Sequence, residues 1–382
     1  MSETLSNVAE VAPLIRERAA EIEQGRQVPA DVVGLLAEAG CLRMLVPAHH
    51  GGDALPLADA LRVIEEISRA DGSTGWLIGQ IGLAHLLFAC FPEQAQKEIY
   101  AGGPDVAGAG AVAPKGRAAA DGDGWRVTGQ WPFVTGCTHA EWVYLNCMVV
   151  EGRTPQVGPG GVPLTRMALF PAAELEILDT WDVVGLRGTA SHDVRVSGAF
   201  CPGRRGFSLQ GDTPGVRQAV FSIAQAGLLI AAVDLGIAQG ALDEIAELAE
   251  GGRRRSFSRG SMASSPVFQD RLGEAWLTVR AARALLHEEA GAAWETATAG
   301  RVAEPLGRAC LRATAAKVTD LAARAVRTAH ELAGGAAVYQ TSPLQRRLRD
   351  IHTATQHFVN GRDFYATVGA LLVGEKVDPA GF

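Results

Sequence analysis

The stretch GWRVTGQWPFVTGCTHAEWVYLNC, residues 124–147, marks a change in the character of this chain. It holds short runs of β-branched and aromatic residues, such as WRVTG at 125–129, separated by glycine and proline. Runs of this kind, bounded by turn-forming residues, are typical of β-strands. Similar runs occur at 142–150, 166–171 and 192–198. We therefore expect a mostly antiparallel β domain in the middle of the chain.

Helical patterns lie on both sides of this β region. Upstream, VVGLLAEAG (32–40) and LADALRVIEEISRA (57–70) carry apolar residues three and four positions apart. Gly40 stands where the first of these helices is expected to end. Downstream, Ala-rich helical stretches run from 216 to 373 and predict a bundle of about four long helices.

The predicted fold is of the α+β class and has three domains. They are an N-terminal helical domain (1–107), a central antiparallel β domain (108–210) and a C-terminal four-helix bundle (211–382). Helices, then strands, then helices is an order that excludes a doubly wound sheet. No GxGxxG motif opens a βαβ unit, which argues against a nicotinamide site of the Rossmann type.

The composition excludes several classes of protein. The chain has 382 residues, of which 47% are hydrophobic and 20% charged, so we expect a large core and no general disorder. Its net charge of −7 argues against nucleic acid as a partner, because a nucleic-acid surface needs a basic face. The uncharged apolar stretch at residues 218–233 is shorter than the roughly 20 residues that cross a membrane. We interpret it as a helix buried in a bundle and expect no membrane contact.

The cysteines and the N-terminus predict a cytoplasmic location. The N-terminal residues lack a basic region followed by an apolar run, so no signal peptide is expected. The six cysteines contain no CxxC pair and are expected to be reduced thiols.

Four segments, in this order, resemble the acyl-CoA dehydrogenase superfamily. Residues 35–76 resemble its first helical domain, residues 124–147 and 181–196 its β domain, and residues 332–357 a part of its C-terminal bundle. The resemblance covers nearly the whole chain. It implies a flavin between the β domain and the bundle, and a homotetramer.

The resemblance also implies flavin contacts in the β domain. Phe133 falls where the family places an aromatic ring against the flavin, and Thr135 falls where a hydroxyl residue approaches the N5 edge. Ser191 is a further candidate for hydrogen bonds to flavin or substrate, together with Thr189. The alternatives are that Phe133 is strand core, that Thr135 is simply a β-former, and that Thr189 and Ser191 close a turn.

A second set of flavin contacts is expected in the bundle. Residues 253–269 resemble the family's Arg-containing loop, in which Arg259 and Gln269 are candidates for binding the flavin phosphate. The alternative is an exposed loop without a ligand.

Departures from the family pattern argue against acyl-CoA dehydrogenation. The family's carboxylate base commonly lies nine residues beyond the arginine of an Arg-Asp pair, here Arg349-Asp350, and that position holds Phe358. Some members carry the base on the first long bundle helix, yet no Asp or Glu lies between Asp212 and Asp234.

The same departures resemble a sister group, the flavin-dependent two-component monooxygenases (group D). In that group a separate flavin reductase supplies reduced FMN or FADH2, which reacts with O2 to give a C4a-hydroperoxyflavin that hydroxylates the substrate. The segments DGSTGW (71–76), GQWPFVTGC (129–137) and WDVVGLRGTASHDV (181–194) carry this resemblance.

The resemblance to this group also implies functional histidines in two regions. These two regions hold His85 and His357, which we predict to be catalytic together with Ser191. His352 is an alternative to His357. Histidine suits proton transfer near neutral pH. The alternative for His85 is a core role, because it lies in the apolar stretch LIGQIGLAHLLFAC. No spacing such as HExxH occurs, so no metal site is expected.

The sequence therefore predicts the oxygenase component of a two-component flavin-dependent monooxygenase that hydroxylates a small, aromatic substrate with O2. Two alternatives stay open. One is an FAD-dependent acyl-CoA dehydrogenase-like oxidoreductase with a displaced base, and the other is a catalytically silent flavin-fold protein that acts as a binding subunit.

Overall fold

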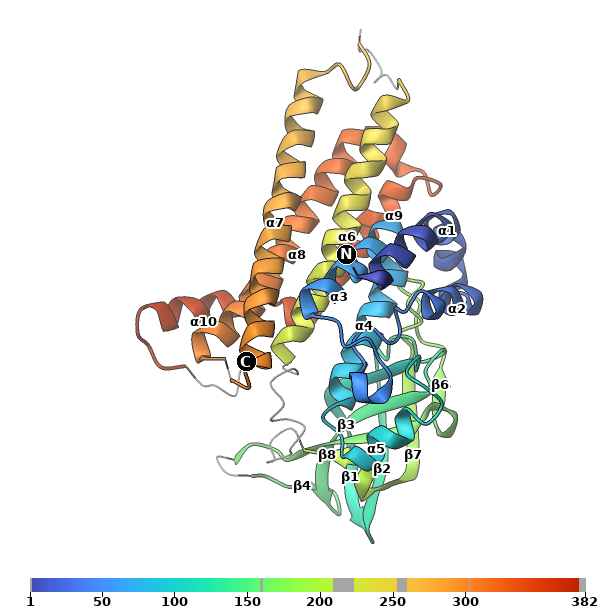
Figure 1. Ribbon diagram of the computed structural model, residues 1–382, viewed down its shortest axis with the longest axis vertical. Coiled ribbons are helices and arrows are strands. Elements are labelled where there is room, and N and C mark those ends of the chain that lie inside the picture. Colours follow the sequence, from blue (N-terminus) through green and yellow to red (C-terminus); the bar gives the residue numbers. More distant parts are fainter. Residues whose placement is uncertain (1, 159–160, 209–222, 253–259, 302, 378–382) are drawn as a thin grey trace.

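The chain folds into N-terminal helices, one β-sheet and a set of long C-terminal helices (Figure 1). The computed structural model describes residues 2–158, 161–208, 223–252, 260–301 and 303–377. In Figure 1 the sheet forms the lower part of the molecule, and the long helices rise above it. The predicted α+β class is confirmed. The exact domain boundaries stay predictions, and the one at 210/211 lies outside the described residues.

The N-terminal region is built around one fully apolar helix. Its α-helices are α1 (Glu3–Gly25), α2 (Ala30–Glu38), α3 (Leu57–Ala70), α4 (Gly72–Phe88) and α5 (Glu93–Ile99). All residues of α4 except Gln80 are buried, as expected for a helix that is apolar on every side. Asp71 caps its N-terminus by accepting hydrogen bonds from the Thr74 backbone N–H and from Thr74 Oγ1, both at 2.8 Å.

The described strands form one sheet in the order β6-β7-β2-β1-β3-β5-β8, with β4 paired to β3. They are β1 (Gly108–Asp121), β2 (Gly124–Trp131), β3 (Trp142–Glu151), β4 (Thr154–Pro155), β5 (Thr165–Pro171), β6 (Glu176–Leu178), β7 (Asp193–Pro202) and β8 (Gly206–Phe207). The pairing is mostly antiparallel, but β1 and β3 are parallel, which corrects the expectation of an antiparallel domain at this pair. The reason is the connection at 132–141, which leads the chain from β2 across to the other side of β1. This connection carries Phe133 and Thr135.

The end of β2 is fixed by a close approach between a glycine and a tryptophan. A Cβ atom on Gly116 of β1 would lie 2.0 Å from the indole of Trp131. Trp131 is fully buried, and its Nε1 donates to Asn146 O at 2.7 Å. The connection at 132–141 therefore starts from a rigid point.

The C-terminal helices are α6 (Ile223–Glu250), α7 (Pro266–Thr298), α8 (Pro305–Ala333), α9 (Pro343–Ala354) and α10 (Asp363–Leu372). The segment Gln225–Glu250 of α6 is long and apolar enough to cross a membrane, yet 94% of its most apolar window is buried, as in a core helix. In the described chain α10 is different, because none of its residues is buried. Figure 1 shows α10 extending away from the other long helices.

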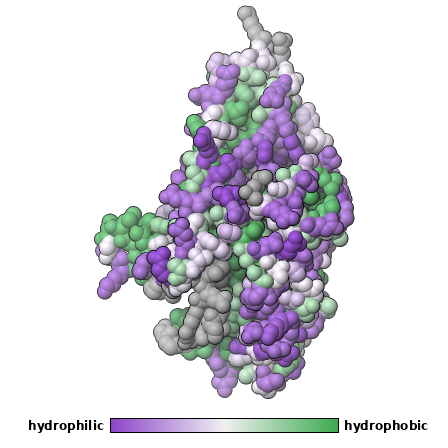
Figure 2. All heavy atoms as spheres, in the orientation of Figure 1, coloured by the Kyte–Doolittle hydropathy of each residue, from purple (hydrophilic) through white to green (hydrophobic). Residues whose placement is uncertain are grey.

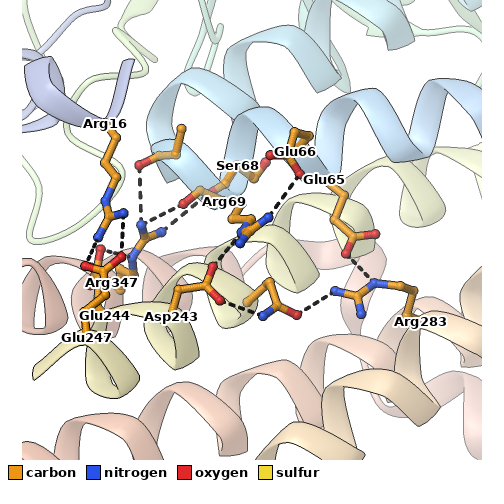
Figure 3. A network of polar contacts seen from close by, with 12 residues as sticks. Arg16, Glu65, Glu66, Ser68, Arg69, Asp243, Glu244, Glu247, Arg283 and Arg347 are labelled. Atoms are coloured by element: carbon orange, nitrogen blue, oxygen red, sulfur yellow. Dashed lines mark hydrogen bonds and ion pairs between the residues drawn. The ribbon is translucent and has the colours of Figure 1, made fainter. Parts of the chain in front are cut away.

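A polar network fastens α3 to the bundle (Figure 3). Arg347 of α9 is buried, and it donates from Nε to Glu244 at 2.7 Å and from Nη2 to the Arg69 carbonyl at 2.7 Å. Arg69 in turn pairs with Asp243 of α6 at 2.5 Å. Breaking a buried pair of this kind costs about 3–5 kcal/mol. The network thus holds the N-terminal helices in one position on the bundle.

Candidate active site

Two segments of the β domain meet at a cluster of hydroxyl side chains. Thr135 Oγ1 lies 2.8 Å from Ser191 Oγ, which lies 2.7 Å from Thr189 Oγ1. The Gly136 N–H donates to the Thr189 carbonyl at 3.0 Å, so the backbone also joins the two segments. All three hydroxyl side chains are buried. The structure therefore brings together Thr135 and Ser191, which are far apart in the sequence.

The donors and acceptors of this hydroxyl cluster fall into one order. The Thr189 hydroxyl donates to the Leu186 carbonyl at 2.9 Å, so Ser191 must donate to Thr189 and Thr135 must donate to Ser191. Trp76 Nε1 donates to Thr135 Oγ1 at 3.3 Å. The hydroxyl chain therefore runs from Trp76 through Thr135, Ser191 and Thr189 to the Leu186 carbonyl. Every hydroxyl hydrogen is donated within this hydroxyl chain. The oxygens of Thr135 and Ser191 can therefore only accept hydrogen bonds from a bound group.

Phe133 presents its ring at the surface beside this hydroxyl chain. The residue is 70% exposed, and its φ of 63° lies in the left-handed region, which a bulky residue seldom adopts. Its ring meets Trp181 edge-on, with 6.1 Å between the ring centroids. The strand-core alternative for Phe133 is therefore wrong. The β-former alternative for Thr135 is also wrong, because β2 ends at Trp131.

These features fit a flavin, which has a flat apolar ring system and a polar edge of nitrogen and oxygen atoms. The exposed ring of Phe133 is available for stacking on the flat face. The acceptor oxygens of Thr135 and Ser191 suit an N–H donor, such as the one that reduced flavin carries at N5. The roles of these three residues toward a flavin stay predictions.

Asp350 of α9 fixes the loop at the end of the hydroxyl chain. Its Oδ1 accepts a hydrogen bond from the Leu186 N–H at 2.6 Å. Burial, followed by the negative charge of Asp71, raises the pKa of Asp350 to about 7. A Cβ atom on Gly185 would lie 2.2 Å from the Arg349 carbonyl, so glycine is required where this loop touches α9. The bundle thus positions the hydroxyl chain through the backbone.

His357 lies next to the hydroxyl chain. Its ring stands edge-on to Trp76 with 5.6 Å between the centroids, and its Nδ1 accepts from the Val359 N–H at 3.4 Å. Burial, and then the positive charge of Arg312, lower the pKa of His357 to about 4. The imidazole is therefore neutral at pH 7, and because its Nδ1 is an acceptor, its Nε2 carries the hydrogen and is a donor. His352 is exposed near the end of α9, so His357 is the histidine of this region that contacts the site.

His85 lies elsewhere. It stands nine residues beyond Trp76 on α4, which is about 13 Å along the helix axis. It is fully buried, with Nδ1 3.0 Å from Tyr100 Oη and its ring edge-on to Phe88. Burial lowers its pKa to about 4. The structure therefore places His85 in the packing of the N-terminal helices and does not bring it to the hydroxyl chain.

Of the two candidates for the flavin phosphate, the structure describes only Gln269. Arg259 lies outside the described residues. Gln269 is exposed in the first turn of α7, where its Nε2 donates to the Ala263 carbonyl at 2.8 Å. A phosphate contact by either residue stays a prediction.

Sequence reasoning missed Asp350 and Arg312 as members of the site. Asp350 had a signal, because it belongs to the Arg-Asp pair of the resemblance. Arg312 lies in an Ala-rich helix and had a weaker one: no Asp or Glu occurs within four residues on either side of it.

Known proteins resemble this chain over most of its length. It matches the family "Acyl-CoA dehydrogenase, N-terminal domain" over residues 7–103 and "Acyl-CoA dehydrogenase, C-terminal domain" over residues 228–361. It is 32% identical over 367 residues to an indole-3-acetate monooxygenase of Pseudomonas putida, an alignment that covers 95% of this chain and 92% of that protein. It is 30% identical over 400 residues to the oxygenase component of an FADH2-dependent resorcinol hydroxylase of Rhizobium sp. (strain MTP-10005), with 99% and 95% covered.

A solved structure shares the whole fold. XiaF from Streptomyces sp., in complex with FADH2 and glycerol, has a TM-score of 0.89 and 26% sequence identity, and the superposition covers 99% of this chain and 96% of that one. The predicted family, fold and enzyme class are thereby confirmed. The chain belongs to the oxygenase components of the flavin-dependent monooxygenases with an acyl-CoA dehydrogenase fold.

Proposed function

We propose that this enzyme hydroxylates a small aromatic substrate with O2 and with reduced FAD from a separate flavin reductase. The observation that carries the proposal is the directed hydroxyl chain beside the exposed ring of Phe133. The names of the relatives support an aromatic substrate, because one acts on indole-3-acetate and another on resorcinol. Reduced FAD is supported by the name of the resorcinol hydroxylase and by the FADH2 bound to XiaF. An oxygenase component implies a partner that supplies the reduced flavin.

The bound reduced flavin would supply two electrons to O2, so that one oxygen atom enters the substrate and the other leaves as water. Phe133 would cover the face of the ring system, and Thr135 and Ser191 would accept hydrogen bonds from its polar edge. His357, which is neutral at pH 7 and accepts at Nδ1, would donate a hydrogen bond from its Nε2–H to the substrate. Trp76 is buried between His357 and Thr135 and would keep water from the site.

The rival function, acyl-CoA dehydrogenation, has no exposed carboxylate base among the residues that the structure describes at this site. Phe358 occupies the position where a carboxylate is expected, and its side chain cannot take a proton. Among the described acids near the site, Asp350 is buried and bonded to the Leu186 N–H, and Asp71 is buried and bonded to Thr74.

The proposal includes a homotetramer in the cytoplasm. In Figure 2 an apolar patch covers the end of α10, where Leu372 and Val373 are 68% and 77% exposed. Exposed apolar patches of this kind mark interfaces, and a second copy of the chain is the partner that a homo-oligomer supplies. All six cysteines are free thiols, which suits a reducing compartment.

Rapid mixing tests the proposed function. The protein is loaded anaerobically with reduced FAD and mixed with buffer that contains O2, and the absorbance is followed. We expect a transient spectrum that differs from both reduced and oxidised FAD, and ¹⁸O from ¹⁸O₂ in a hydroxylated aromatic product. Immediate return to oxidised FAD with one equivalent of H2O2, or reduction of bound FAD by an acyl-CoA, would contradict the proposal.

A further inference from the structure

Among the described residues two arginines are buried, and they differ in their partners. Arg347 is 3% exposed and donates to Glu244 and to backbone carbonyls of α3 (Figure 3). Arg312 of α8 is 5% exposed, and its Nε is buried without an acceptor. In the described part of the chain Arg312 has no hydrogen bond or ion pair, and its guanidinium lies over the ring of Phe364 at 4.0 Å.

The described residues around Arg312 offer it no acidic partner. Its helix carries no Asp or Glu within four residues of it, so an ion pair along α8 is impossible. Arg324, farther along the same helix, does have such a pair, with Asp320 at 2.9 Å. A buried guanidinium without an anion is unfavourable, and contact with an aromatic ring offsets this only in part. The guanidinium of Arg312 is therefore available to bind an anion that comes from outside the chain.

Arg312 faces the active site. Its positive charge reaches His357 and lowers the pKa of that residue in addition to burial. One turn farther along α8, Ala315 packs against Gly227 of α6, where an added Cβ would lie 2.9 Å from Ala315 Cβ and 3.8 Å from the Val359 carbonyl. This face of α8 therefore looks toward residues 357–359.

A continuous series of contacts leads from there to the hydroxyl chain. His357 contacts Trp76, and Trp76 donates to Thr135. A cation thus lies at one end of the site and the hydroxyl chain at the other. An aromatic ring with an acidic side group would match both ends.

We propose that Arg312 binds the carboxylate of the substrate, so that this enzyme acts on small aromatic acids. This inference rests on the proposed function and names its substrate class. A guanidinium presents five N–H donors in a fixed fork that matches the two oxygens of a carboxylate. Phe364 limits the rotation of the fork by covering one of its faces. The charged end of the substrate would then be held at α8, and its ring would lie toward His357 and Trp76.

Calorimetric titration tests the inference. Wild-type protein with reduced FAD is titrated anaerobically with benzoate, phenylacetate and indole-3-acetate, and with the neutral amide of each. We expect at least one acid to bind 10- to 100-fold more tightly than its amide. The Arg312→Gln variant is expected to lose that factor for the acid and to keep the affinity for the amide within about twofold. Arg312→Lys, which keeps the charge without the fork, should fall between the two.

Controls separate binding from folding. Arg324→Gln removes an exposed arginine from the same helix and should leave both affinities unchanged. Because Arg312 is buried without an anion, Arg312→Gln and Arg312→Met should melt at or above the wild-type temperature without ligand, and the acid should raise the melting temperature of the wild type alone.

Several outcomes would overturn the inference. They are equal affinity of wild type for acids and amides, equal loss of both ligands in Arg312→Gln, or full acid affinity in that variant. The proposed function fails separately, in the rapid-mixing experiment without substrate. A normal transient with no preference for acids removes the inference alone, whereas a clear preference with no transient removes the monooxygenase function and leaves the anion site.

Discussion

Thr135 is the residue on which the hydroxyl chain depends, because it accepts from Trp76 and donates to Ser191. Thr135→Val keeps the shape of the side chain and removes both hydrogen bonds. We expect the free energy of unfolding to fall by about 1–3 kcal/mol, because the Trp76 N–H is left buried without a partner. We also expect a hydroxylation rate about 10- to 100-fold lower. Urea unfolding and single-turnover kinetics measure the two effects. Thr135→Ser keeps the hydroxyl and serves as the control. Wild-type stability and rate in the valine variant would refute the role of the hydroxyl chain.

His357 and His352 form a matched pair for a second test. His357 contacts Trp76, whereas His352 is exposed. His357→Ala is expected to lower the rate of product formation about 100-fold at pH 7, with electrons diverted to H2O2. His352→Ala should keep the wild-type rate and product yield. Product and H2O2 are quantified per reduced FAD consumed, and an equal effect of the two substitutions would rule out a specific role for His357.

The candidate site was predictable where its residues share a local motif. Phe133 and Thr135 lie in one turn-rich connection, and their resemblance to family positions located them without any contact information. Arg312 was not predictable in this way, because its environment comes from α10 and the segment after α9, which are remote in the sequence. His85 lies in an apolar stretch, and that stretch folds as a helix buried on every side. Burial was therefore the stronger physical signal at this position.

At the scale of the elements, the contact between α6 and α8 holds a buried acid. Asp234 is fully buried and accepts a hydrogen bond from Thr319 Oγ1, while its Oδ1 has no partner among the described residues. Burial raises the pKa of Asp234 to about 7. The folded protein thus keeps a proton that the unfolded chain loses above about pH 4. The contribution of Asp234 to stability is therefore fully present below about pH 4 and is lost as the pH rises through about 7.

Asp234→Asn tests this pH dependence. The variant is uncharged at every pH and can still accept a hydrogen bond from Thr319. We expect the free energy of unfolding of the variant to rise relative to that of wild type by a few kcal/mol as the pH goes from 5 to 8. The size follows because one pKa unit corresponds to about 1.4 kcal/mol. Urea unfolding at the two pH values measures the difference. The same difference at both pH values would show that Asp234 is not a neutral acid in the folded protein.

The order of the elements was predictable because helices and strands repeat their apolar residues with different periods. The parallel pairing of β1 with β3 was not, because it depends on where the connection at 132–141 crosses the sheet. Gly116 illustrates the reason. Its importance lies in an approach to Trp131 that no local pattern records.

At the scale of the whole molecule, the proposed homotetramer predicts that α10 lies in an interface between copies of the chain. The double variant Leu372→Asp/Val373→Asp places two charges on the exposed apolar patch and should convert a tetramer into smaller species. Size-exclusion chromatography with light scattering gives the masses. Val157→Asp, at a residue 60% exposed and remote in the sequence, is the control and should leave the mass unchanged. A tetramer that survives the double substitution would exclude α10 from the interface.

The position of the hydroxyl chain has a consequence for how such enzymes diversify. Its three hydroxyls belong to the β domain and end on a backbone carbonyl, whereas Arg312 and Phe364 belong to the bundle. Under the proposed function, substitutions on α8 and α10 would change which molecules are accepted and leave the handling of oxygen intact. Substrate choice and oxygen chemistry would then depend on side chains from different domains.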